Sequence, residues 1–208
     1  PYTTLFRSGA IFCTMSKEPL DTRETILNAT WQLLESNPGQ EVSMSAIAKA
    51  SGISRQAVYL HFPSRTELMI ATSNYVDELK GLPERLAKLE TVDSGEALLD
   101  TCVEVWCSYI PEIYGIAKAF DLARASDEAM AAAWDNNMAC LLDVCKSTVK
   151  VLHKEEKLSK KLNQKQAAQL LYSLISFNQW EQLTQEFGWN TKHFVQTMQE
   201  VCRRSLLN

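Results

Sequence analysis

Two short segments of helical pattern, joined by a glycine, most restrict the fold of this chain. Ser43 can cap a helix over Met44–Ala50, and Ser54 can cap another over Arg55–His61, because a serine at the N-cap accepts from a free backbone amide. Gly52 lies between them and can adopt the positive φ of a tight turn. Four apolar residues are available for a shared small core: Ile47, Ile53, Val58 and Phe62. The pattern predicts a helix-turn-helix.

Further helices are predicted on both sides of this pair. One helix precedes it, from a D-x-x-E capping box at Asp21 to a Pro-Gly turn after Ser36. Another follows, from an S-x-x-E box at Ser64 through Leu79. Breaks at Gly81–Pro83 and Thr91–Gly95 separate it from five later helices, over Glu96–Tyr109, Glu112–Ala125, Asp127–Lys154, Asn163–Phe187 and Thr191–Leu207. We therefore expect an all-α fold.

Composition supports helices and at first argues against a nucleic-acid partner. The 208 residues include only seven Gly and six Pro, and no run of about 18 apolar residues could span a membrane, so we expect a cytoplasmic protein. There are 21 Lys and Arg against 25 Asp and Glu. However, residues 42–66 hold three cations (Lys49, Arg55 and Arg65) and no acid, which is the charge pattern of a DNA-binding face.

The stretch Val42–Leu68 resembles the DNA-binding domain of the TetR family of transcriptional regulators. The family pattern is roughly I-A-x-x-A-G-V-S-x-x-x-[LV]-Y-x-[HY]-F-x-[SN]-K-x-x-L, from which this chain departs at Ser51, in place of the usual Ala, and at Arg65, in place of Lys. The resemblance implies an N-terminal three-helix helix-turn-helix DNA-binding domain over residues 21–66. It also implies a larger helical ligand-binding and dimerisation domain over residues 67–208.

A DNA-binding role predicts which side chains contact bases and which contact phosphates. Arg55 can bond guanine O6 and N7 and Gln56 can bond adenine N6 and N7, while Tyr59 suits a phosphate oxygen. We predict a DNA-binding set of Ser43, Lys49, Ser54, Arg55, Gln56, Tyr59, His61, Ser64 and Arg65. Other interpretations stay open: Tyr59 as a half-buried packing residue, Lys49 as a solvated charge, or a helix-turn-helix that serves protein contacts.

The later helices carry many large amphipathic side chains. The resemblance implies an inducer pocket among them, for which we predict Trp106, Tyr109, Met138 and Phe177 as lining residues, although most such side chains at helical spacing are ordinary core. The scarcity of basic residues there favours a neutral or cationic apolar ligand. Two apolar stripes can pack on a second copy as a four-helix bundle or serve as intramolecular core: Ala167, Leu171, Leu174 and Asn178, then Phe194, Met198, Val201 and Cys202.

Other classes of protein find little support. Six cysteines form no CxxC pair and three histidines stand alone, so we expect reduced thiols packed as small hydrophobes and no metal site. No nucleophile or acid–base motif is visible, so we expect neither an enzyme nor a cofactor. Residues 1–20 are expected to be a non-native or disordered leader. Residues 1–14 begin PYTTLFRS, which resembles a translated sequencing adapter, and Met15 offers a start.

These features favour a ligand-responsive DNA-binding regulator. It would repress transcription by binding a palindromic double-stranded operator as a homodimer, and a small apolar or amphipathic inducer would release it. The alternative is a helical small-molecule or protein-binding module that no longer reads DNA.

Overall fold

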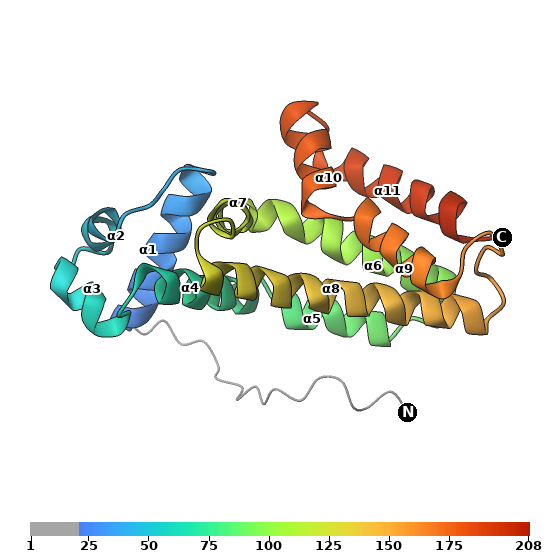
Figure 1. Cartoon of the computed structure of the whole chain (residues 1–208), viewed down its shortest axis with the longest axis horizontal. Coiled ribbons are helices and arrows are strands. Elements are labelled where there is room, and N and C mark those ends of the chain that lie inside the picture. Colours follow the sequence, from blue (N-terminus) through green and yellow to red (C-terminus); the bar gives the residue numbers. More distant parts are fainter. Residues whose placement is uncertain (1–20) are drawn as a thin grey trace.

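The computed structural model describes residues 21–208, so the predicted leader, with its expected artefact over residues 1–14, lies outside the described residues. Within residues 21–208 all regular structure is helical, apart from an isolated bridge between Leu158 and Leu207. The prediction of an all-α fold is therefore confirmed. The molecule is elongated, with α2 and α3 at one end and the C-terminus at the other (Figure 1). No helix of this part is long and apolar enough to cross a membrane.

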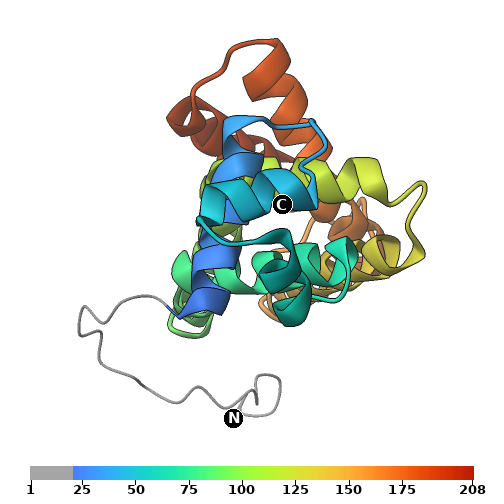
Figure 2. The ribbon, with the colours of Figure 1, turned by 90° about the vertical axis from the view of Figure 1, so that its left-hand side faces the viewer.

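The predicted helix-turn-helix is present. It consists of α2 (Met44–Ser51) and α3 (Arg55–His61), and α1 (Thr22–Ser36) precedes it. The three helices face the viewer in Figure 2. Gly52 ends α2 with a φ of 71°, as the turn requires. The shared core forms as expected, since Ile47, Val58 and Phe62 are buried and Ile53 packs against them.

One predicted cap is wrong. The Asp21 carboxylate accepts no backbone amide, although Asp21 is the residue before α1. Its carbonyl oxygen instead accepts from the Thr25 amide at 2.9 Å and from the Thr25 hydroxyl at 3.2 Å. Residues 21–24 are exposed, so water can satisfy the free amides of this first turn.

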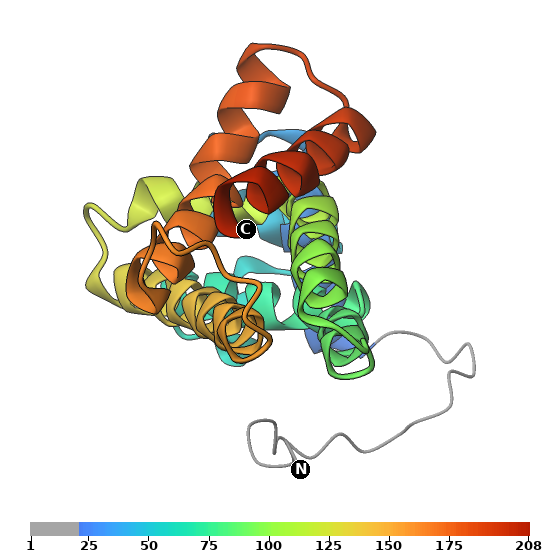
Figure 3. The ribbon, with the colours of Figure 1, turned by 90° about the vertical axis from the view of Figure 1, so that its right-hand side faces the viewer.

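The rest of the chain forms a helical body. Its helices are α4 (Arg65–Leu79), α5 (Leu82–Ala87), α6 (Gly95–Tyr109), α7 (Tyr114–Ala123), α8 (Glu128–Lys154), α9 (Gln164–Leu174), α10 (Phe177–Glu181) and α11 (Thr191–Leu206). Figure 3 looks along α6 and α8, with α11 packed on α6 and α9 packed on α8. Helix α4 runs without a break across the predicted domain boundary at residues 66 and 67.

Three predicted helix limits differ from the structure. The Gly81–Pro83 break opens α5, because Gly81 adopts a φ of 64° and proline is tolerated in a first helical turn. Helix α7 begins at Tyr114 rather than Glu112, since Ile110–Glu112 forms a 3₁₀ turn that contains Pro111.

The third difference is a break inside the helix predicted over Asn163–Phe187. Helix α9 ends at Leu174, and the Ser176 hydroxyl caps α10 by accepting from the Gln179 amide at 3.2 Å. A π-helical turn over Gln182–Glu186 then follows α10. The break turns Phe177 and Trp180 into the core, where both are buried.

The two stripes considered for a dimer mostly serve the core of the single chain. Ala167 and Leu171 are buried on α9, which packs against α8. Phe194, Met198 and Cys202 are buried on α11, which packs against α6. The intramolecular alternative therefore holds for these residues, and a dimer needs another surface. The expected thiol packing also holds for four of the five cysteines in residues 21–208: Cys102, Cys107, Cys145 and Cys202 are buried and Cys140 is exposed.

Helix α1 meets the start of α7 at very short range. The Glu35 carboxylate accepts from the Gly115 amide at 2.9 Å and from the Ile116 amide at 3.4 Å. A Cβ on Gly115 would lie 2.3 Å from the Leu34 carbonyl oxygen and 2.6 Å from the Glu35 nitrogen. Only glycine fits this contact between the helix-turn-helix and the body.

We predict that Gly115→Ala lowers the free energy of unfolding by about 1–3 kcal/mol, because the methyl group must push α7 away from the backbone of α1. Urea unfolding followed by circular dichroism measures the change. A stability within about 0.5 kcal/mol of wild type, as for an ordinary surface substitution, would contradict the close approach.

Candidate DNA-binding interface

The exposed face of α3 carries the side chains predicted to read bases. Arg55 and Gln56 are exposed in its first turn, and Tyr59 is 39% exposed one turn later. Arg55 Nη2 donates to the Tyr59 hydroxyl at 3.4 Å, and the Arg55 guanidinium carbon lies 5.5 Å from the Tyr59 ring centroid. The opposite face, with Val58, is buried. Tyr59 therefore belongs to the outward face rather than to the core.

The predicted N-cap serines all cap their helices, but they differ in what their hydroxyls face. Ser43 accepts from the Ala46 amide at 3.2 Å and Ser54 from the Ala57 amide at 3.1 Å. Ser64 accepts from the Glu67 amide at 3.1 Å and also donates to Glu67 Oε1 at 3.3 Å. A carboxylate beside Ser64 repels a phosphate, so this arrangement disfavours the phosphate contact predicted there.

Arg65 does more than present a charge. Its Nε donates to the Val42 carbonyl oxygen at 3.0 Å, which ties the start of α4 to the residue preceding the Ser43 cap of α2. Arg65 is half-buried, whereas Lys49 and His61 are exposed. The predicted DNA-binding residues thus lie on α2, α3, α4 and their N-caps, and Arg65 also ties α4 to the segment before α2.

The cations of this end form no ion pair within residues 21–208, although the hydrogen bond from Thr66 and, more weakly, the charge of Arg65 lower the pKa of Asp127. Among the ion pairs of residues 21–208, none includes Lys49, Arg55 or Arg65, whereas Arg85, Lys118, Lys157 and Arg203 of the body are all paired. A fourth cation joins them, since the Arg23 guanidinium carbon lies 4.9 Å from the Phe62 ring centroid. Arg23 was not among the predicted residues because it precedes the basic window by almost twenty residues. Leu60, which is 87% exposed on α3, was not predicted either.

The predicted ligand-lining residues are not gathered around a described cavity. Tyr109 is 1% exposed and donates its hydroxyl proton to Asp77. Phe177 is buried against the rings of Tyr114, Trp134 and Trp180, and Trp106 and Met138 are half-buried. A cavity of about 230 Å³ is lined by Arg85, Lys88, Thr101, Glu104, Val105 and Ser108. A second, of about 150 Å³ between α4, α7 and α8, is lined by Ile70, Ser73, Asn74, Phe120, Ala133, Asn136 and Asn137.

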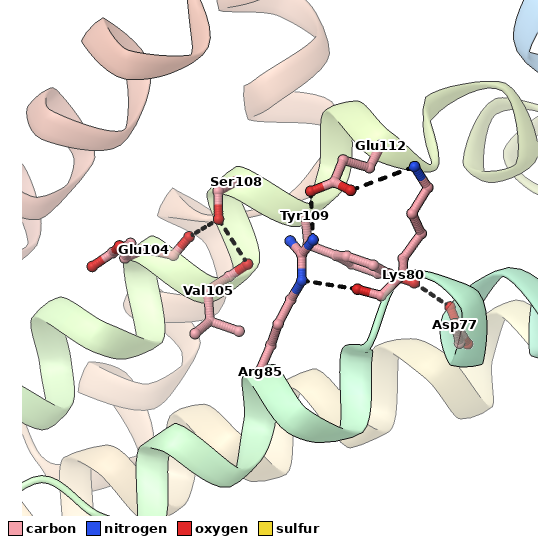
Figure 4. Close-up of polar contacts among 8 residues, drawn as sticks. All are labelled: Asp77, Lys80, Arg85, Glu104, Val105, Ser108, Tyr109 and Glu112. Carbon is pink, nitrogen blue, oxygen red and sulfur yellow. Dashed lines mark hydrogen bonds and ion pairs between the residues drawn. The ribbon is translucent and has the colours of Figure 1, made fainter. Parts of the chain in front are cut away.

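A polar network joins the end of α4 to α5 and α6 (Figure 4). Arg85 Nε donates to the Lys80 carbonyl oxygen at 3.1 Å, and Arg85 Nη2 donates to Glu112 Oε1 at 2.6 Å. The Lys80 ammonium lies 3.6 Å from Glu112 Oε2. The Arg85 guanidinium also lies over the Tyr109 ring, at 5.4 Å from its centroid. The segment after α4 is therefore held to the segment after α6 by charge-assisted hydrogen bonds.

Burial shifts the ionisation of the acids at these junctions. Desolvation raises the pKa of Glu35, although the amides of Gly115 and Ile116 oppose the shift. Desolvation also raises the pKa of Asp77, opposed by the hydrogen bond from Tyr109. Burial first, and then the charge of Asp77, raises the pKa of Tyr109, so its hydroxyl remains a donor.

Comparison with known proteins decides the family. Residues 26–72 match the model of the bacterial regulatory proteins of the tetR family, which covers α1, α2, α3 and the start of α4. Residues 26–72 are a DNA-binding domain of the TetR family. The predicted resemblance is thus confirmed, and the exposed α3 is the second helix of a TetR-type helix-turn-helix.

Relatives found by sequence match about a third of this chain, whereas the solved structures match most of it. Nucleoid occlusion factor SlmA of Marinomonas sp. is 39% identical over 64 residues, which is 31% of this chain and 32% of the relative's length. A transcriptional regulator from Saccharomonospora viridis, solved with choline, has a TM-score of 0.77 at 17% identity, covering 89% of this chain and 97% of its own. AibR, solved with isovaleryl coenzyme A and operator DNA, has a TM-score of 0.68 at 16% identity, covering 87% and 97%. The two structures share the fold of the whole described chain.

Arg55 and Arg65 should affect DNA binding differently. We expect Arg55→Ala to reduce affinity for a preferred duplex about tenfold or more, and to reduce affinity for a scrambled duplex far less, because a bidentate contact to guanine is lost. Arg65→Ala should weaken both duplexes by the same factor, and it should also lower the free energy of unfolding because the bond to the Val42 carbonyl is lost. Fluorescence anisotropy titrations on the two duplexes measure this.

Arg65→Lys is the matched control, since it keeps the charge. If Arg55→Ala weakened both duplexes equally, the division between base reading and backbone contact would be wrong.

The raised pKa of Glu35 makes the stability of the junction depend on pH. Above the unfolded pKa of glutamate, about 4.3, the folded state binds more protons than the unfolded state until pH passes the raised folded pKa. The contribution of Glu35 therefore falls as pH rises through this window. We expect the stability of Glu35→Gln to improve relative to wild type over the same window, measured by urea unfolding from pH 4 to 7. A stability difference that is constant with pH would show that Glu35 ionises normally.

Proposed function

We propose that this TetR-family protein is a ligand-responsive transcriptional repressor. It binds a palindromic operator as a homodimer, and a small apolar or amphipathic inducer releases it. The proposal rests on one observation at the end of the molecule formed by α1, α2 and α3 (Figure 2). The cations around the outward face of α3 form no ion pair within residues 21–208. Cations outside ion pairs are free to neutralise phosphates, whereas several cations of the body, such as Arg85, Lys118 and Arg203, are engaged in ion pairs.

The dimer uses apolar side chains that the core leaves outside. Phe187 is 65% exposed after the π-helical turn that follows α10, and Leu183 and Trp189 are half-buried beside it in sequence. The Trp189 amide donates to the Leu183 carbonyl oxygen at 3.0 Å, so the chain folds back tightly around Phe187. An exposed phenylalanine on a rigid turn is a suitable anchor for a symmetric contact with the same surface of a second copy.

The inducer site is proposed among the aromatic residues of the body. The predicted lining residues, Trp106, Tyr109, Met138 and Phe177, remain the candidates for it. The Trp106 indole N–H is buried and has no acceptor within residues 21–208, and a ligand with an acceptor atom would satisfy it. The fold is shared with regulators solved with choline and with isovaleryl coenzyme A, which supports a small-molecule role for the body. A ligand that prefers the conformation with misplaced α3 helices lowers DNA affinity by that preference.

Two other functions are less well supported. The similarity to SlmA covers only 31% of this chain and 32% of the relative's length, so it carries no argument for a role in nucleoid occlusion. A helical binding module that no longer reads DNA would leave the unpaired cations and the outward face of α3 without a role.

Selection from random duplexes tests the proposal. We expect the purified protein to enrich a palindromic sequence with half-sites about one helical turn, or a multiple of it, apart. Its affinity for that duplex should fall by about a thousandfold or more between about 50 and 200 mM salt, because each subunit releases counterions from several phosphates. Failure to enrich any sequence, or affinity independent of salt, would contradict the proposal.

Phe187→Glu tests the dimer within the same assay. We expect this variant to be monomeric by light scattering at micromolar concentration and to bind the selected palindrome much more weakly, because charges at the dimer contact repel each other. Leu79→Glu is the matched control, since Leu79 is 48% exposed at the end of α4 and should tolerate the charge. A Phe187→Glu variant that stays dimeric would place the contact elsewhere.

A further inference from the structure

The recognition helix exposes one large apolar side chain to an unusual degree. Leu60 is 87% exposed, more than Phe187 at 65%, Leu122 at 52% or Leu79 at 48%. A leucine gains free energy when its side chain leaves water. Within residues 21–208 Leu60 gains little of this free energy, so its apolar surface is available for a partner.

The position of Leu60 on α3 indicates the partner. At about 100° per residue, Leu60 lies roughly 40° around the helix from Gln56 and about 100° from Tyr59, on the face opposite the buried Val58. The remaining residues of this outward face, Arg55, Gln56 and Tyr59, are polar or amphipathic. Leu60 is thus a single apolar side chain on the face of α3 that the proposed function directs into the major groove.

A partner for one isolated leucine has to be small and apolar. The neighbours of Leu60 include Gln56, one turn earlier, and His61, and residues 42–66 contain no acid, so this face does not form the broad apolar patch typical of a protein interface. The edges of bases in the major groove present one apolar group, the C5 methyl of thymine. Its size matches the single side chain.

We propose that Leu60 is a specificity-determining residue that reads a thymine methyl group in each half-site of the operator. This inference rests on the proposed function, because it requires α3 to enter the major groove. Gln56, one turn earlier on the same face, is suited to a neighbouring adenine. The two residues together favour an A·T-containing step at the centre of each half-site contact.

Removal of the methyl group alone tests the proposal. In the duplex selected by the wild-type protein, each thymine is replaced in turn by deoxyuridine, symmetrically in both half-sites, and affinity is measured by fluorescence anisotropy. We expect one position at which the replacement weakens wild-type binding about fourfold per half-site, as for the loss of one buried methyl group. With Leu60→Ala, the same replacement should have no effect.

Leu79→Ala is the matched control, because it shortens an exposed leucine outside α3 and should keep the full deoxyuridine effect. If every thymine tolerated replacement in wild type, or if Leu60→Ala kept the sensitivity, Leu60 would not read a methyl group although the protein binds DNA. If no duplex were enriched, the proposed function would fail and this inference with it. The two failures are therefore distinguishable.

Discussion

The contact of the Glu35 carboxylate with the first amides of α7 is the interaction on which the arrangement of the molecule depends. It satisfies two N–H groups that a helix cannot satisfy itself, and it places an acid at the positive end of the α7 dipole. Gly115 allows the backbones of α1 and α7 to approach until a Cβ would overlap the Leu34 carbonyl. Helix α1 also packs against α2 and α4. The position of α3 relative to α7 therefore depends on the Glu35 carboxylate and on the absence of a side chain at Gly115.

Two further polar contacts make the junction stiff. The Thr66 hydroxyl donates at 2.5 Å to Asp127, whose side chain caps α8, so the start of α4 is bonded to the start of the longest helix. At the other end of α4, Lys80 and Arg85 meet Glu112. Helix α4 is thus held at both ends by groups of the body, and α1 is held by a third group. In the proposed ligand-responsive regulator, a shift of α7 or α8 would have to move the DNA-binding end or break these bonds, which would give coupling between the two sites a physical route.

The parts that could be predicted from the sequence are those with local causes. Ser43, Ser54 and Gly52 act within three or four residues of themselves, so the limits of α2 and α3 and the outward face of α3 followed from spacing alone. Glu35 and Gly115 are eighty residues apart, and nothing in either local sequence indicates the other. Arg65 and Val42 are likewise distant in sequence. Arg65 was predicted only as a DNA-binding residue, and its hydrogen bond to the Val42 carbonyl oxygen gives it a structural role in addition. The break before Ser176 was missed because the apolar pattern continues through it, and only burial of Phe177 and Trp180 decides the bend.

The negative net charge of the chain and the cations of its helix-turn-helix end are explained by how the cations are paired. In the body, several cations lie within 4 Å of carboxylates and the opposite charges offset each other locally, as at Lys118 with Glu181 and at Arg203 with Asp100. At the helix-turn-helix, Arg55 rests on Tyr59 and Arg23 on Phe62, and aromatic rings hold a guanidinium in place without neutralising it. The net charge of −4 therefore describes a body that repels DNA, joined to an end that attracts it. Such a distribution orients the protein before contact, because only the α3 end can approach the phosphates favourably.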